Sequence, residues 1–472
     1  MITKIRVDGF RSLSEFELDI NPGLNILVGP NGAGKTNIVT FFEFLSLLMT
    51  DSLSMAVAKL GGAGSVFRKI KKDQFVDTIK ISISGKRKAH VSRGSSSQLL
   101  FYQYSCSVSL SESRDAVYFS DQNFKVHSAR RNQTRLLRLE NDDYRDLDIG
   151  VHYQISNSDD EDNNYKIEIK KYDSKRLPPT MFFHSKDLKN IDMEDLIRVD
   201  VAGSRSSDLS LASHLSWTFD FVREIIDDIA SGQAFNILPE SVRKAEDSTR
   251  LPGISKDGSG LAATLYALDQ AQKQSSSSAR RKHRSAMFRS MPRRLRYYSM
   301  QFKASYSEVR DLTRLIYPAL KDIKVNSDTF NSRLYVTLEI DSGNNSSIEV
   351  PLNSVSDGTV KWMSLIAAIL TNRTVFSIEE PENFIHPLMQ QELLTIMRED
   401  SEKNKKEKFI LMTTHSETLL NSADPSEIIF VQFESGHTTA HRIKNPSHLR
   451  NEIRNSGFGL GHYYVTGVAK DV

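Results

Sequence analysis

A chain of 472 residues has room for about three domains and a substantial hydrophobic core. Its 62 Lys and Arg nearly balance 59 Asp and Glu, so the overall charge neither requires nor excludes a polyanionic partner. Cys106 is the only cysteine, which excludes an intramolecular disulfide and multi-cysteine zinc sites and favours a cytoplasmic protein. No stretch of about 18 apolar residues occurs, so no membrane span is expected.

A glycine-rich loop near the N-terminus is the strongest signal in the chain. Alternating residues predict strands at 2–7, 16–20 and 24–28, and the apolar pattern of 38–48 predicts a buried helix. Between them, residues 29–36 read Gly-Pro-Asn-Gly-Ala-Gly-Lys-Thr, which fits the phosphate-binding pattern G-x-x-x-x-G-K-[ST]. The alternative is a glycine turn before a core helix, but the flanking strand and helix favour a nucleotide site.

The chemistry of this loop follows from its residues. Gly32 and Gly34 let backbone N–H groups turn inward around a phosphate at the positive end of the following helix. Lys35 is expected to reach the β and γ phosphates, and the Thr36 hydroxyl to bind Mg²⁺. We therefore expect ATP and Mg²⁺ as ligands, with the loop residues Asn31, Gly32, Ala33, Gly34, Lys35 and Thr36 around the nucleotide.

The middle of the chain is less informative. Alternating segments at 76–84, 101–110, 116–119 and 165–169 predict a β-rich lobe, and a helical pattern follows from 206 to 237. The acidic run Asp159–Asp162 is interpreted as a solvated hairpin tip rather than a metal site, because adjacent carboxylates on a loop do not converge by themselves.

A basic stretch lies between residues 272 and 303. It holds ten Lys or Arg residues, and no Asp or Glu occurs between Asp269 and Glu308. The arginines from Arg280 to Arg296 lie near Phe288, Tyr297 and Tyr298, a mixture typical of surfaces that bind phosphate backbone and stack bases. The alternatives are a solvated helix or a contact with an acidic protein partner.

The C-terminal part returns to alternating strands and helices. Three stretches follow one another there: Ser354–Thr359 before an apolar helix at 360–370, an apolar strand at 375–378 that ends in Glu379 and Glu380, and a strand at 409–412 followed by Thr413, Thr414 and His415. Further strands are predicted at 334–340, 347–350 and 428–431, and helices at 387–397 and 417–421.

In this order, the motifs resemble the ATPase head of the ABC superfamily, in its soluble branch with RecF, SMC-type proteins and the OLD-like ATPases of the AAA_15 and AAA_21 type. Residues 5–13 and 257–262 resemble that branch too. The resemblance implies an α/β, ABC-type P-loop ATPase head built from N- and C-terminal segments, with an inserted β-rich lobe and a helical lobe. The expected domains are an N-terminal ATPase lobe (1–95), a β-rich lobe (96–200), a helical insertion with the basic stretch (201–320) and a C-terminal ATPase lobe (321–472).

The resemblance also implies roles for individual residues. Glu379 and Thr36 would hold Mg²⁺, Glu380 would orient or deprotonate the attacking water, His415 would sense the γ phosphate, and Arg11 would contact the nucleotide. Ser356 and Gly358 stand where the signature loop contacts ATP held by a second head, so a homodimer or higher oligomer is expected. Asp357 replaces a glycine there, which would weaken these contacts. The alternative is an exposed strand end at Glu379 and Glu380 and a histidine beside a helix cap at His415.

Two classes of function fit this resemblance. The first is an ATP-gated oligomeric switch that controls a separate effector, such as a nuclease or TOPRIM-type protein, in antiphage defence systems similar to Septu and PARIS. The second is a RecF-like repair or recombination ATPase that binds nucleic acid through Arg280–Arg296; a transporter motor fits less well. Only 57 residues follow His415, so we expect any nuclease to be a separate chain.

Overall fold

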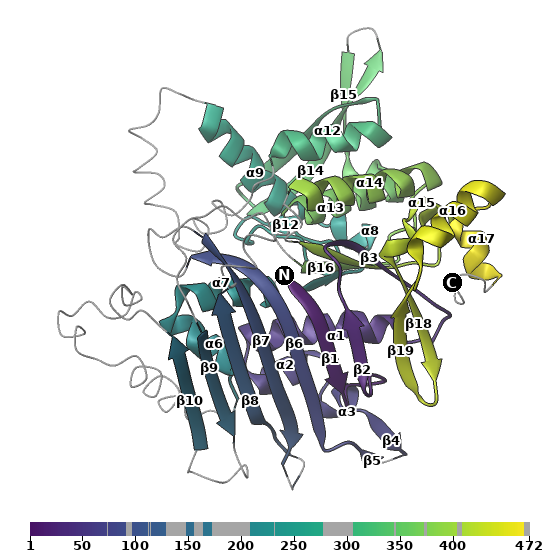
Figure 1. Ribbon diagram of the computed structural model, residues 1–472. Coiled ribbons are helices and arrows are strands. Elements are labelled where there is room, and N and C mark those ends of the chain that lie inside the picture. Colours follow the sequence, from purple (N-terminus) through teal and green to yellow (C-terminus); the bar gives the residue numbers. More distant parts are fainter. Residues whose placement is uncertain are drawn as a thin grey trace.

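The computed structural model describes residues 1–72, 74–90, 97–111, 113, 115–128, 148–154, 164–171, 208–230, 232–276, 305–343, 346–371, 375–403 and 408–466. These residues form two large sheets, smaller sheets and covering helices (Figure 1). The acidic run Asp159–Asp162 and the basic stretch Arg280–Arg296 lie outside the described residues.

The first large sheet is antiparallel and has the order β10-β9-β8-β7-β6-β1-β2. Its strands alternate between buried and more exposed residues, as β7 shows over residues 97–108, so one face packs on a core and the other faces outward. The strands are β1 (Ile2–Asp8), β2 (Phe16–Asp19), β6 (Thr78–His90), β7 (Ser97–Leu110), β8 (Val117–Ser128), β9 (Asp148–Gln154) and β10 (Asn164–Lys171).

The second large sheet has the order β11-β16-β17-β3-β18-β19 and is parallel except for β19. All five residues of β17 are buried, the apolar run expected of a parallel strand covered on both faces. The strands are β3 (Gly23–Val28), β11 (Gln233–Phe235), β16 (Val375–Glu379), β17 (Phe409–Thr413), β18 (Ile428–Glu434) and β19 (His437–Arg442).

This parallel sheet divides the hydrophobic core into two parts. Phe409 and Leu411 join the cluster shared with α1 and the antiparallel sheet, whereas Ile410 and Met412 join the cluster shared with α13, because successive strand residues point to opposite faces. The helices on the first side are α1 (Lys35–Thr50), α2 (Leu53–Lys59), α3 (Ala63–Val66), α6 (Leu211–Thr218) and α7 (Asp220–Ala230).

The helices on the other side surround α13, whose buried Trp362 donates through its indole N–H to the Leu312 carbonyl of α12 at 3.1 Å. A smaller sheet lies beyond them (Figure 1). Its strands are β12 (Glu246–Asp247), β13 (Leu320–Asp328), β14 (Arg333–Gly343) and β15 (Ser346–Pro351); the remaining elements are β4 (Lys69–Lys71), β5 (Gln74–Phe75), α8 (Pro239–Val242), α9 (Leu261–Ser276), α12 (Tyr306–Ile316), η4 (Leu352–Ser354), α13 (Asp357–Thr371), α14 (Pro387–Lys403), α15 (Glu417–Ser422), η5 (Pro425–Glu427), α16 (Pro446–Ser456) and α17 (Leu460–Val465).

The structure corrects the helical prediction for 206–237. Helix α7 ends at Ala230, and Gln233–Phe235 form β11, which pairs in parallel with Phe376–Ile378 of β16. A strand of three residues is too short to show a period, so the neighbouring helical pattern hides it. Strands β9, β13 and β19 were also missed.

The predicted boundary at 95–96 lies between β6 and β7, which pair along their whole length. The described parts of the first two expected domains therefore share one sheet. The four-part division of the chain stays a prediction.

The contact between the N-terminal turn and α1 gives a test of the core. Phe10 is fully buried, and its ring lies 5.5 Å from that of Phe41 and 5.4 Å from that of Phe44. We expect Phe10→Ala to lower the free energy of unfolding in urea by about 3–5 kcal/mol, because it leaves a cavity in a packed aromatic cluster. Phe330→Ala removes a ring that is 99% exposed and is the control, with a change of less than about 0.5 kcal/mol.

Candidate nucleotide site

The glycine loop connects β3 to α1 and is held in shape by a distant strand. Gly34 has φ +102°, and a Cβ on it would collide with the side chain of Thr438. Thr438 is fully buried on β19 and donates from its hydroxyl to the Ala33 carbonyl at 3.0 Å. Position 34 therefore requires glycine for its backbone conformation and for this close approach.

Helix α1 begins directly at this loop. Gly34 offers no side-chain cap, and the first turn contains no acidic residue. The first amides of a helix have no partner within the helix and carry its positive dipole end. The start of α1 can therefore receive an anion from the loop side.

The Lys35 side chain folds back onto the glycine loop. Its ammonium group donates to the Gly29 carbonyl at 2.8 Å and to the Pro30 carbonyl at 3.0 Å. Burial lowers the pKa of Lys35, and the negative charge of Glu380 opposes this shift. The amine therefore lies close enough to Glu380, at the end of β16, to feel its charge.

Parallel strand pairing brings the carboxyl pair at the end of β16 to the loop. Glu379 pairs in register with Thr413 of β17, and Thr413 pairs with Leu27 of β3. Burial raises the pKa of Glu379, whereas the nearby charge of Lys256 and the Thr36 hydroxyl lower it.

Glu380 begins a tight turn after β16. It has a positive φ of 42°, a strained conformation that often marks functional sites. Its N–H donates to the Thr413 carbonyl at 3.1 Å, and its carboxylate accepts from the Asn383 amide at 3.1 Å. The turn thus fixes both the backbone and the carboxylate of Glu380.

Glu382 connects this turn to His415. One carboxylate oxygen accepts from the Thr414 hydroxyl at 2.9 Å and from the His415 backbone N–H at 2.7 Å. His415 is exposed and lies just before α15. The segment that carries the histidine is therefore bonded to the segment that carries Glu380.

The signature-like residues lie at the N-terminus of α13. Ser356 is exposed and accepts from the Thr359 N–H at 3.3 Å. A Cβ on Gly358 would lie 2.6 Å from the Phe384 carbonyl, so glycine is needed for this contact with the turn after β16. Asp357 forms an ion pair of 2.6 Å with Arg243.

Arg243 also holds the loop before α13. Its guanidinium donates to the Leu352 carbonyl at 3.2 Å and to the Val355 carbonyl at 2.7 Å. The negative charge of Asp357, expected from the sequence to weaken the signature loop, is thus offset by a local cation.

Arg11, in the turn after β1, approaches the glycine loop between β3 and α1. It donates to the Asn37 side chain at 3.4 Å and to the Thr40 hydroxyl at 3.2 Å. Asn37 donates to Ser12, whose hydroxyl lies 2.6 Å from that of Thr438. A chain of hydrogen bonds therefore runs from Arg11 to the loop, and burial lowers the pKa of Arg11.

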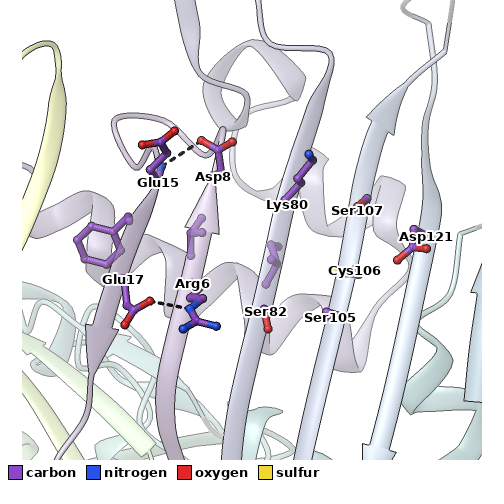
Figure 2. A pocket seen from close by; sticks show the side chains of 13 residues that line it. Arg6, Asp8, Glu15, Glu17, Lys80, Ser82, Ser105, Cys106, Ser107 and Asp121 are labelled. Atoms are coloured by element: carbon purple, nitrogen blue, oxygen red, sulfur yellow. Dashed lines mark hydrogen bonds and ion pairs between the residues drawn. The ribbon is translucent and has the colours of Figure 1, made fainter. Parts of the chain in front are cut away.

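A separate pocket lies on the outer face of the antiparallel sheet. Figure 2 shows Arg6 paired with Glu17, and the Glu15 backbone bonded to Asp8, on one side of it. Its lining residues come from β1, β2, β6, β7, β8 and the Glu15 turn, and they carry both signs of charge. It shares no lining residue with the glycine loop or with the carboxyl pair.

Sequence reasoning missed several residues that shape the site. Arg243 and Thr438 have no motif of their own, and the structure alone places them against the loop segments. Glu382 and Asn383 stand two and three residues after the carboxyl pair, and this position was their one available signal.

The parallel sheet, the loop between β3 and α1 and the carboxyl pair at the neighbouring strand end define an ABC-type P-loop ATPase head. A family model described as "AAA ATPase domain" matches residues 1–420. The chain belongs to this family.

The curated relatives match short segments. The DNA replication and repair protein RecF of Bifidobacterium adolescentis is 36% identical over 100 residues, which cover 20% of this chain and 25% of the relative. The DNA double-strand break repair Rad50 ATPase of Methanopyrus kandleri is 46% identical over 39 residues, 8% of this chain and 4% of the relative. The chain thus spans about a quarter or less of the length of these relatives.

Among solved structures, an Smc head bound to the C-winged helix domain of ScpA matches with a TM-score of 0.42 and 12% identity, covering 94% of this chain and 99% of that one. The SMC head domain of Thermotoga maritima matches with a TM-score of 0.35 and 9% identity, covering 94% and 99%. In the part of the chain that the structure describes, no helix is long and apolar enough to cross a membrane.

The contact of Arg243 with Asp357 can be tested through ATPase activity. We expect Arg243→Met to lower kcat/KM for ATP about tenfold, because it leaves Asp357 unpaired and two carbonyls without their donor. Arg243→Met combined with Asp357→Asn should recover part of this loss. Arg333→Met removes an exposed arginine of β14 and serves as the control; a double variant no better than the single one would contradict the pairing.

Proposed function

We propose that this protein is an ATP-gated switch in which ATP joins two heads and hydrolysis separates them. The observation that carries the proposal is the parallel pairing of β16 with β17 and of β17 with β3, in which Glu379 pairs with Thr413 and Thr413 with Leu27. It brings the carboxyl pair of the C-terminal part beside the phosphate loop of the N-terminal part. A nucleotide bound there would touch both parts of the chain at once.

The residues present fit a bound Mg²⁺. The Thr36 hydroxyl and the Glu379 carboxylate are hard oxygen donors of the kind this ion prefers, and the Thr36 hydroxyl is near enough to lower the pKa of Glu379. When bound, Mg²⁺ would neutralise charge on the β and γ phosphates.

Each protein group would then have its own role in hydrolysis. The Lys35 amine would leave the Gly29 and Pro30 carbonyls for the phosphates, which are stronger acceptors. The carboxylate of Glu380, held by Asn383, would accept a proton from the attacking water as its oxygen bonds to the γ phosphorus. The bond to the β–γ bridging oxygen breaks, and ADP and phosphate leave. His415, tied to the same turn through Glu382, would report the γ phosphate.

The signature loop supports action between two chains. Ser356 is exposed at the start of α13, so its hydroxyl and the neighbouring amides are accessible to a phosphate held by a second head. Each site would then be completed in trans by Ser356 and Gly358 of a second copy, as a homodimer or within a larger oligomer. Hydrolysis would depend on the joining of heads.

Two roles compete for this switch. In the first, it controls a separate effector, a nuclease or TOPRIM-type protein, in antiphage defence; the resemblance of its ATPase motifs to those of such ATPase subunits supports this role. In the second, it is a RecF-like repair ATPase, which the identity of 36% over 100 residues to RecF supports. In the second role, Arg280–Arg296 would bind DNA directly.

The catalytic assignment is tested by two variants. Glu380→Gln should bind ATP, hydrolyse it at least about 100-fold more slowly and trap joined heads, because the amide cannot accept the proton. Lys35→Ala should lose ATP binding and joining. Binding by a fluorescent ATP analogue, phosphate release and light scattering separate these outcomes; hydrolysis by Glu380→Gln at the unmodified rate would refute the role of Glu380.

The two roles differ in DNA binding. If the basic stretch neutralises phosphates of the DNA backbone, changing Arg293, Arg294 and Arg296 to Ala should weaken binding and reduce the slope of log affinity against log salt by about 0.9 for each phosphate left without its arginine. The matched control changes Lys71, Lys86 and Lys125, which are exposed on β4, β6 and β8, to Ala. Unchanged binding and slope in the arginine variant would contradict DNA binding through this stretch.

A further inference from the structure

Lys361 is a buried lysine whose place in the site no motif explains. It lies on α13, three residues after Gly358, and is only 2% exposed. Its ammonium group donates to the backbone carbonyl of Glu380 at 3.2 Å and lies 5.8 Å from the centre of the Phe384 ring. The side chain thus runs from the signature helix to the turn that carries the proposed catalytic carboxylate.

This lysine is costly for the fold. Burial lowers the pKa of Lys361 to about 8, although the carboxylates of Glu382 and Glu380 favour its charged form. Replacing buried charges by apolar side chains of similar size is often neutral or stabilising, so stability alone does not explain an amine here. The fully buried Lys408 differs, because it pairs directly with Asp400 at 2.6 Å and also donates to the Ile369 carbonyl.

The acceptor of Lys361 is a strained peptide. Glu380 has a φ of 42°, and its carbonyl also accepts from the Asn383 N–H at 3.3 Å. Helix α13 touches the same turn a second time, where Gly358 packs on the Phe384 carbonyl. A shift of α13 would therefore be transmitted to both ends of the turn, and the amine would act on the residue whose carboxylate must be aimed at water.

We infer that Lys361 is a positioning residue that couples the signature helix to the carboxylate of Glu380 within the same chain. When a second head's nucleotide engages Ser356 and Gly358, the position of α13 is fixed, and Lys361 passes this position to the turn after β16. ATP bound in one site would then set the position of the Glu380 carboxylate in the other site. This inference rests on the proposed function, because it requires Glu380 to act on ATP.

The experiment compares Lys361→Met, Lys361→Arg and the matched control Lys408→Met in the full chain. We expect Lys361→Met to lower kcat for ATP about 10–100-fold while KM and the affinity for a fluorescent ATP analogue stay within about threefold, because positioning affects the reacting geometry rather than ground-state binding. Lys361→Arg, which keeps a cation and donor, should retain more activity than Lys361→Met. Lys408→Met should change the midpoint of thermal unfolding more than it changes kcat per folded molecule.

Two results would overturn the inference: a kcat of Lys361→Met within twofold of the unmodified protein, or a loss of ATP affinity that matches the loss of kcat. If Lys361→Met does not fold, Lys361→Gln replaces it and is judged by the same two criteria. The unmodified protein and Glu380→Gln are measured in parallel. If Glu380→Gln is inactive but Lys361→Met is fully active, the coupling alone fails; if Glu380→Gln is fully active, the proposed function itself fails.

Discussion

The pairing of β3 with β17 and of β17 with β16 is the constraint on which the rest of the site depends. It joins residues separated by nearly four hundred positions in the chain and ends three strands at one edge. Because the strands are parallel, the loop after β3, the turn after β16 and the segment after β17 all emerge on the same side. This strand register therefore places Thr36, Glu379 and His415 at the same edge of the sheet.

Most of the strands around the site could be predicted because their patterns are local. The glycine loop has a fixed spacing, and the apolar runs of β16 and β17 stop at charged or hydroxyl-bearing residues, so both their type and their ends are visible in the sequence. Strand β11 could not be found in this way, because three residues carry no period and its pairing with β16 depends on the tertiary fold.

The contacts that shape the site were less visible than its motifs. Arg243 meets Asp357 across more than a hundred positions, and nothing in either neighbourhood indicates the pairing. The positive φ of Glu380 could not be predicted from the sequence either, because glutamate rarely adopts this conformation. Sequence reasoning therefore identified the groups proposed for chemistry and missed most of those that hold them in place.

Several charged groups here are kept in surroundings that disfavour their charge. Burial lowers the pKa of Lys35 and Lys361 and raises that of Glu379. Interactions between charges are stronger in such a low-dielectric site than in water. The charges of a bound triphosphate would therefore change the pKa values of these groups much more than they would on an open surface.

Thr438 has a consequence for how this protein is made. The loop whose motif is complete by residue 36 takes its shape from a hydroxyl on β19, more than four hundred residues later. During synthesis, the nascent chain would carry the entire phosphate-binding motif long before the strand that supports it had left the ribosome. Competence to hold a nucleotide would thus arrive late, when β19 docks against β18 and the last edge of the sheet closes over the loop.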